Sequence, residues 1–254
     1  MAKGLIKSPR EIGLIKESCR IVAEVLALLG PRVKPGTRTR DLDAIAEEYI
    51  RSQGGEPAFK GYGSDRTNLF PGTLCVSIDD VVVHGIPDGR TIEEGQVVSV
   101  DVGVRKGGYY GDGARSYPVG RVSEEKRRLL RVTEESLLKG IAEARAGNHV
   151  HDVSAAVQRH VEDAGFAVVR DLVGHGIGRN LHEEPSVPNF GEPGTGALLK
   201  QGMTLAIEPM VNAGTGRVRM EDDGWTVRTA DGRPSAHFEH TIVVTAGEAE
   251  ILTK

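Results

Sequence analysis

The stretch that most constrains the fold is a hairpin between residues 97 and 119, VVSVDVGVRKGGYYGDGARSYPV. Two alternating runs, rich in β-branched and aromatic residues, flank a turn at residues 106–108. If residues 106 and 107 form the loop, Asp101 lies directly opposite Asp112 on the same face, and moving the turn by one residue makes them diagonal neighbours. Opposed like charges destabilise a sheet. The hairpin therefore predicts a cation between the two carboxylates, with two solvent-satisfied aspartates as the alternative.

Composition and charge narrow the class of protein. The chain has 254 residues, of which 39% are hydrophobic and 27% charged, as in a soluble globular domain. Its net charge of −4 gives no sign of a nucleic-acid-binding surface. We expect no signal peptide and no membrane span, because the longest apolar stretch covers only residues 21–29. Two cysteines, Cys19 and Cys75, argue against a disulfide scaffold and favour a reducing cytoplasm.

Local signals predict four helices separated by strand-rich stretches. A capping box opens the first helix at Pro9, and glycine and proline end it after Leu29. The other helices are expected near residues 39–53, 123–146 and 152–164. Strands are expected at 73–79 with a return at 81–85, and later at 167–178, 203–211, 217–229 and 236–245.

A faint internal repeat links two distant segments. Residues 33–54 align without gaps on residues 144–165, and each copy follows a long helix and precedes a β-rich stretch. Identical residues coincide at four pairs of positions: Gly36/Gly147, Asp41/Asp152, Ala44/Ala155 and Gly54/Gly165. Chance similarity between two amphipathic helices is the alternative. A true repeat predicts two similar halves packed together, with a shared site between them.

Three further polar residues are flanked by glycine-rich or apolar sequence, which is unusual for polar side chains. His175 lies within a glycine-rich GHGIG segment, while Glu208 and Glu239 each border an apolar run. Each one alone is more simply structural. Together with the aspartate pair they give four carboxylates and one imidazole, and four close carboxylates cannot all stay ionised without cations. Two divalent ions that share bridging carboxylates would use all five groups, and this donor set suits manganese, iron or cobalt, with zinc as a further candidate.

The ordered motifs VVVHGIP, SVDVG, GYYGDGARSY, GHGIGRNLHEEP, LAIEPMV, DDGWTVRTADG and AHFEHT closely resemble type I methionine aminopeptidases. The resemblance extends from about residue 8 to residue 250. It implies an α+β "pita-bread" fold with two pseudo-symmetric halves, a curved antiparallel sheet and outer helices. The expected organisation is a single catalytic domain over residues 1–254 that begins with a short N-terminal helix.

The resemblance also implies a role for each ligand. Asp101 would bind one ion, and His175 and Glu208 would bind the other. Asp112 and Glu239 would bridge both ions, together with a water or hydroxide that attacks the scissile bond. A monovalent cation site is further implied at the positions of Asp79, Val81 and Ser235, but Asp79 replaces a neutral asparagine of the relatives.

The same resemblance names catalytic and substrate-binding residues. His84 and His182 match two active-site histidines, one contacting the scissile amide and the other stabilising the tetrahedral intermediate, while Glu208 would handle the proton of the attacking water. The implied methionine pocket is lined by Tyr62, Phe70, Cys75 and Trp225, with Phe59 and Leu181 nearby. Here the chain departs from its relatives, because the GYGSDRTNLFPGTLC segment carries extra residues and Leu181 replaces a phenylalanine.

The remaining histidines are weaker candidates. His237 shares a predicted strand face with Glu239 and is a candidate to support a ligand, whereas His240 points the other way. His149, His151 and His160 are expected to face solvent on or before a helix.

The sequence thus predicts a dimetal aminopeptidase that removes the initiator methionine of new proteins when the second residue is small. The chain's own Ala2 suits such processing. A proline-specific aminopeptidase or dipeptidase of the same fold, and a non-catalytic peptide- or ribosome-binding relative, are the alternatives. The expected partner is the N-terminal peptide of nascent proteins, with transient ribosome contact, no membrane and a monomeric state.

Overall fold

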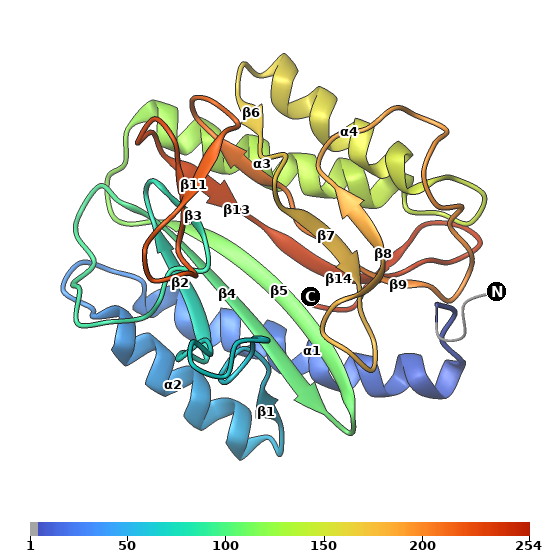
Figure 1. The fold of residues 1–254 in the computed structure, drawn as a ribbon, viewed down its shortest axis with the longest axis horizontal. Coiled ribbons are helices and arrows are strands. Elements are labelled where there is room, and N and C mark those ends of the chain that lie inside the picture. Colours follow the sequence, from blue (N-terminus) through green and yellow to red (C-terminus); the bar gives the residue numbers. More distant parts are fainter. Residues whose placement is uncertain (1–4) are drawn as a thin grey trace.

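A nine-stranded, mostly antiparallel sheet forms the centre of the computed structural model, which describes residues 5–254 (Figure 1). Its strand order is β1-β4-β5-β14-β9-β7-β8, with β2 added beside β4 and β15 beside β14. Their bounds are Glu56–Pro57 (β1), Leu74–Ile78 (β2), Val97–Lys106 (β4), Tyr109–Pro118 (β5), Val173–Gly176 (β7), Glu183–Pro188 (β8), Thr204–Ile207 (β9), Glu239–Val243 (β14) and Glu250–Ile251 (β15). Ala2 lies outside the described residues.

Two three-stranded sheets complete the β structure. One has the order β13-β10-β6 and the other β11-β12-β3. Their strands are Val81–Val83 (β3), Ala167–Val168 (β6), Met210–Asn212 (β10), Val218–Met220 (β11), Val227–Thr229 (β12) and Ser235–His237 (β13).

Within residues 5–254, four α-helices pack against the central sheet in two pairs. They are Pro9–Leu29 (α1), Thr39–Ser52 (α2), Glu124–Glu143 (α3) and Val150–Asp163 (α4), with a short 3₁₀ turn at Gly30–Arg32 (η1). The pair α1 and α2 packs with β2 and β4, and the pair α3 and α4 lies in the other half of the molecule (Figure 1). One apolar core fills each half. No helix within residues 5–254 is both long and apolar enough to cross a membrane.

Local capping signals set the starts of α1 and α4. The hydroxyl of Ser8 accepts a hydrogen bond from the Glu11 amide, and the Glu11 carboxylate accepts one from the Ser8 amide, which confirms the capping box. Helix α4 begins at Val150, earlier than predicted, because the Asp152 carboxylate caps the His149 amide at 2.6 Å.

The internal repeat is confirmed by the backbone. Helices α2 and α4 begin and end at corresponding positions of the two aligned segments, and each is followed by a short strand, β1 or β6, at corresponding positions. The paired glycines share a left-handed conformation, with φ of 88° and 100° at Gly36 and Gly147, and 68° and 75° at Gly54 and Gly165. The chain therefore has two similar halves, and β5 pairs with β14 where they join.

The predicted turn of the central hairpin is wrong by one residue. The two-residue loop is Gly107–Gly108, where φ is 59° and 82°, and Lys106 pairs with Tyr109. Both central positions of this loop have positive φ, which two glycines adopt at little cost and Lys106 does not. Lys106 therefore stays in the strand.

This shift changes how the two aspartates face each other. Asp101 pairs with Ala114, and Asp112 pairs with Gly103, so the predicted direct opposition is wrong. The carboxylates lie instead on the same face as diagonal neighbours, which was the predicted result of moving the turn. Diagonal neighbours still reach one another across a ladder, so the electrostatic conflict remains.

Two predicted strands have different partners from those expected. Strand β3 does not pair with β2 but with β12, because the backbone oxygens of Asp79 and Asp80 accept hydrogen bonds from Ser235 and Thr229. The segment predicted as one last strand is broken at Phe238 into β13 and β14, which belong to different sheets.

The break at Phe238 faces a second break on the neighbouring chain segment. Pro209 separates β9 from β10, and since proline lacks an amide hydrogen it cannot donate to the ladder. Strand β14 pairs with β9, whereas β13 pairs with β10. Glu208 and Glu239 stand beside these two interruptions, where side chains are directed out of the regular pleat.

Candidate metal centre and substrate pocket

All thirteen residues predicted as divalent-metal ligands, catalytic groups or pocket walls line one cavity. The lining comprises Phe59, Tyr62, Phe70, Cys75, His84, Asp101, Asp112, His175, Leu181, His182, Glu208, Trp225 and Glu239. The roles of these residues as ligands, catalysts or pocket walls stay predictions, but their spatial grouping is a property of the fold.

Four carboxylates enter this cavity from neighbouring strands. Asp101 comes from β4, Asp112 from β5, Glu239 from the start of β14, and Glu208 from the residue after β9. Asp112 is only 4% exposed and Glu239 only 2%. Burial of four acidic groups so close together needs compensation, because a desolvated charge without a partner is strongly unfavourable.

Hydrogen bonds from the protein do not fully compensate for the burial of these carboxylates. Within residues 5–254, Asp101 Oδ1 and Glu239 Oε1 are buried and have no hydrogen-bond partner. One ligand atom from each of Asp112, His175 and Glu239 lies within 4.8 Å of the others. Unpartnered oxygens beside a compact carboxylate–imidazole cluster are what a site for divalent cations requires, so the residues fit the predicted metals.

The five predicted ligands are not equally close. Asp101 and Glu208 lie outside the compact group of three. The Glu208 carboxylate lies 3.5 Å from His175 Nε2, and Asp112 Oδ2 lies 3.9 Å from the same nitrogen. The imidazole of His175 therefore links Glu208 to the compact group.

Burial favours the protonated form of all four acids. It raises the pKa of Asp101 to about 7 and that of Glu208 to about 8. Burial first, and then the charges of neighbouring carboxylates, raise the pKa values of Asp112 and Glu239 well above their usual range. Without cations, this site holds protons at neutral pH.

The backbone around His175 fixes the direction of its ring. Its Nδ1 lies 2.8 Å from the carbonyl oxygen of Gly176 and donates to it, which leaves Nε2 facing the carboxylates. A Cβ at Gly174 would lie 2.5 Å from the Ala206 carbonyl oxygen, and one at Gly176 would lie even closer to that of Glu184. The glycines thus allow the neighbouring strands to approach His175 closely.

His84 and His182 both line this cavity, and burial affects the charge of both rings. His84 has a positive φ of 58°, an uncommon conformation for a residue other than glycine, of the kind that clusters at functional sites. Burial, then the neighbouring His237 and His182, lower the pKa of His84 to about 4. Burial also lowers the pKa of His182. Both rings are therefore neutral near pH 7.

His237 is the residue to which sequence reasoning gave too little weight. It is 1% exposed, and its Nε2 lies 3.6 Å from the second oxygen of Glu208. The available signal was its shared strand face with Glu239. His240, as predicted, points elsewhere, and its Nδ1 lies 2.9 Å from the Thr253 hydroxyl.

An apolar wall adjoins the carboxylates. Phe59, Phe70, Cys75 and Leu181 pack together as a buried cluster, and the Trp225 ring meets Phe70 edge-on at 5.3 Å. The segment with extra residues approaches the tryptophan, because the Trp225 indole donates to the Asn68 carbonyl at 3.2 Å. The pocket therefore has an apolar side and an acidic side.

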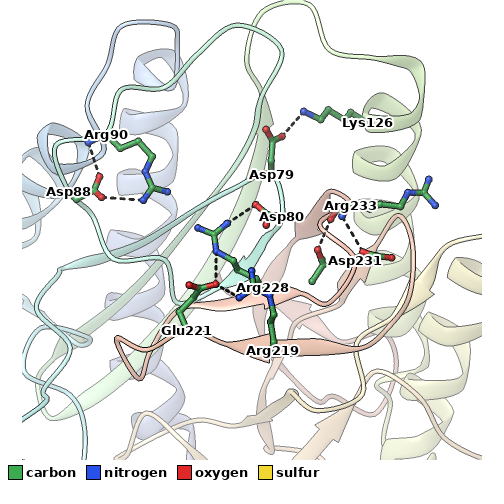
Figure 2. A network of polar contacts seen from close by, with 11 residues as sticks. Asp79, Asp80, Asp88, Arg90, Lys126, Arg219, Glu221, Arg228, Asp231 and Arg233 are labelled. Carbon is green, nitrogen blue, oxygen red and sulfur yellow. Dashed lines mark hydrogen bonds and ion pairs between the residues drawn. The ribbon is translucent and has the colours of Figure 1, made fainter.

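A network of ion pairs joins the ends of β3, β11 and β12 (Figure 2). Arg228 of β12 contacts Asp80 at 2.7 Å and Glu221 at 3.0 Å. The Asp79 carboxylate forms an ion pair with Lys126 Nζ at 2.6 Å and accepts a hydrogen bond from the Val97 amide at 3.0 Å. At the position implied for a monovalent cation, the extra negative charge of Asp79 is thus paired with an ammonium group.

Comparison with known proteins identifies the family to which this chain belongs. The model of metallopeptidase family M24 matches residues 13–246. The chain belongs to metallopeptidase family M24. It is 49% identical over 250 residues to methionine aminopeptidase 1 of Bacillus subtilis, covering 98% of this chain and 99% of the relative.

Solved structures confirm the pita-bread fold of this M24 chain. The methionine aminopeptidase of Thermotoga maritima superimposes with a TM-score of 0.95 at 47% identity, covering 98% of each chain. Prolidase from Pyrococcus furiosus shares the fold at a TM-score of 0.78 and 23% identity, and the match covers 98% of this chain and 65% of the prolidase. The predicted resemblance to methionine aminopeptidases is confirmed.

The raised carboxylate pKa values predict how the stability of the metal-free M24 chain depends on pH. The folded state binds protons at Asp101 and Glu208 that the unfolded chain has already released, so the free energy of unfolding falls as pH rises through the folded pKa values. Buried neutral histidines oppose this trend only below their usual pKa of 6.5. Urea unfolding of chelator-treated protein should therefore show decreasing stability from pH 6.5 to pH 8.

The metal-loaded protein is the control, because cations keep the carboxylates ionised in the folded state and remove the dependence. Stability of the metal-free protein that stays constant or increases over this interval would contradict the account of the carboxylate cluster.

Proposed function

We propose that the chain is a metal-dependent aminopeptidase that hydrolyses the N-terminal methionine of proteins whose second residue is small. The observation that carries the proposal is the single cavity in which four buried carboxylates and His175 adjoin an apolar pocket. Relatives named methionine aminopeptidase that match nearly the whole chain support the choice of substrate.

Two divalent cations would be held by the five predicted ligands. In this proposal Asp101 would hold one ion, His175 and Glu208 would hold the other, and Asp112 and Glu239 would be shared between them. When bound, such cations lower the pKa of water and stabilise negative charge on a reacting oxygen. Manganese, iron, cobalt and zinc all suit the donor set.

The remaining side chains bind the substrate and move protons. The apolar wall receives the methionine side chain, and contact of its sulfur with the Trp225 and Phe70 rings favours a thioether. Glu208 accepts the proton of the attacking water. The neutral rings of His84 and His182 donate hydrogen bonds to the scissile amide and to the oxygen on which charge develops.

This proposal carries over the predicted partner, the N-terminal peptide of newly made proteins. Ribosome contact, a monomeric state, a cytoplasmic location and a bound monovalent cation stay predictions. The Asp79–Lys126 pair favours activity that does not need added sodium or potassium.

Metal reconstitution tests the proposed function. We expect metal-stripped protein to be inactive, and added manganese, iron, cobalt or zinc to restore hydrolysis of Met-Ala-Ser but not of X-Pro peptides. Asp112→Asn keeps the size of the side chain and should be folded yet inactive with every metal, because it removes a bridging carboxylate. Preferential cleavage of X-Pro peptides, or no turnover with any metal, would overturn the proposal.

Replacement of one histidine tests its role as a donor. His84→Ala should lower turnover of Met-Ala-Ser by roughly 10²–10³-fold, the usual effect of removing a donor to a developing oxyanion. Metal content, measured by elemental analysis, should not change. His240→Ala is the matched control, since it removes a half-buried imidazole outside the cavity and should keep full activity. Equal loss of metal and activity in His84→Ala would make His84 a ligand instead.

A further inference from the structure

A short hydrogen bond at the rim of the cavity is not explained by metal ligation. The Tyr62 hydroxyl lies 2.6 Å from Nδ1 of His182, and the two rings meet edge-on with centroids 5.3 Å apart. The His182 ring also contacts the His175 ring, with centroids 4.3 Å apart and the planes at 70°. The imidazole of His182 thus contacts both a proposed ligand and a phenol.

This contact leaves one nitrogen of His182 for a substrate. Burial raises the pKa of Tyr62, so its hydroxyl keeps the proton at neutral pH and can donate it to Nδ1. A neutral imidazole carries one N–H, and when Nδ1 accepts a hydrogen bond the proton resides on Nε2. Nε2–H is then the group that can donate to an oxygen on which negative charge develops.

Tyr62 is itself fixed in place by its backbone. Its amide donates to the Phe59 carbonyl at 2.8 Å, and its carbonyl accepts from the Phe70 amide at 2.9 Å. The segment between Tyr62 and Phe70 is predicted to contain the residues that the chain adds relative to the shorter pattern.

A reciprocal pair of hydrogen bonds attaches this added segment to the loop that carries Trp225. The Asn68 side chain donates to the Asp223 carbonyl at 3.0 Å, and the Trp225 indole donates to the Asn68 carbonyl at 3.2 Å. The added residues therefore anchor the segment on which the phenol stands.

We propose that Tyr62 is a positioning residue that, through its hydrogen bond to His182 Nδ1, holds the Nε2–H of His182 toward the reacting oxygen of the substrate. The inference rests on the proposed aminopeptidase function, and it assigns the added segment the task of supporting this bond. Tyr62 thereby acts through His182 and not only as a wall of the methionine pocket.

Tyr62→Phe is the first test, because it keeps the ring and removes only the oxygen. Turnover of Met-Ala-Ser by the metal-loaded enzyme should fall about tenfold, the rate equivalent of one hydrogen bond, with little change in KM. Tyr117→Phe is the matched control: it removes a tyrosine hydroxyl whose hydrogen bond, to the Leu26 carbonyl at 3.0 Å, lies outside the cavity, so turnover should not change. A change confined to KM in Tyr62→Phe would show a pocket wall and overturn the proposal.

A double-mutant cycle separates positioning from independent action. In a His182→Ala background, Tyr62→Phe should have no further effect on turnover, because the residue on which it acts is gone. Multiplicative losses from the two changes would overturn the proposal.

The tautomer of His182 gives a readout that does not depend on turnover. In zinc-loaded protein with ¹⁵N-labelled histidine, the His182 resonances, assigned by their loss in His182→Ala, should show the proton on Nε2. Tyr62→Phe should shift these resonances toward a mixture of tautomers. A proton on Nδ1 in the unchanged protein would overturn the proposal. Failure to cleave Met-Ala-Ser would instead refute the proposed function and leave the tautomer to be decided by this spectrum.

Discussion

Mutual repulsion among four buried carboxylates is the constraint on which the rest of the structure depends. The fold brings Asp101, Asp112, Glu208 and Glu239 into one cavity and leaves buried oxygens of two of them without a hydrogen-bond partner. Such a group is stable only when its charges are neutralised, either by protons or by cations. Protons neutralise the charge but also block the oxygens as ligands, so the arrangement suits a metal centre that releases protons on binding.

The two-fold internal repeat explains how such a cluster is assembled. Each half contributes a helix pair and strands, and the halves join where β5 pairs with β14. Asp101 and Asp112 come from a continuous hairpin, whereas Glu208 and Glu239 stand at facing strand breaks around Pro209 and Phe238. In the first half, Asp101 and Asp112 thus project from regular strands. In the second half, interruptions of the strand ladder direct Glu208 and Glu239 into the cavity.

Much of this architecture could be predicted from the sequence because its signals are local. Capping residues set the ends of α1, and the glycines of the repeat mark left-handed positions. The motifs around His175, Glu208 and Glu239 identified residues that the fold brings together. The hairpin turn was misplaced by one residue because the requirement for two positive φ angles at Gly107 and Gly108 outweighed a loop that included Lys106.

Features that depend on distant partners could not be read from the chain. The pairing of β3 with β12 arises from hydrogen bonds to Asp79 and Asp80 made by residues far along the sequence. The contact of His237 with Glu208 likewise requires β13 and β10 to lie side by side. No local sequence pattern predicts that Lys126 contacts Asp79, or that Tyr62 contacts His182.

The central claim is that two cations neutralise the carboxylate cluster and share two of its members. Anomalous diffraction from crystals grown with Mn²⁺ tests it most directly, because manganese peaks locate each ion independently of the protein density. The account predicts two manganese peaks in the cavity, with Asp112 and Glu239 each in contact with both ions. A single peak, or two peaks that neither side chain bridges, would contradict it.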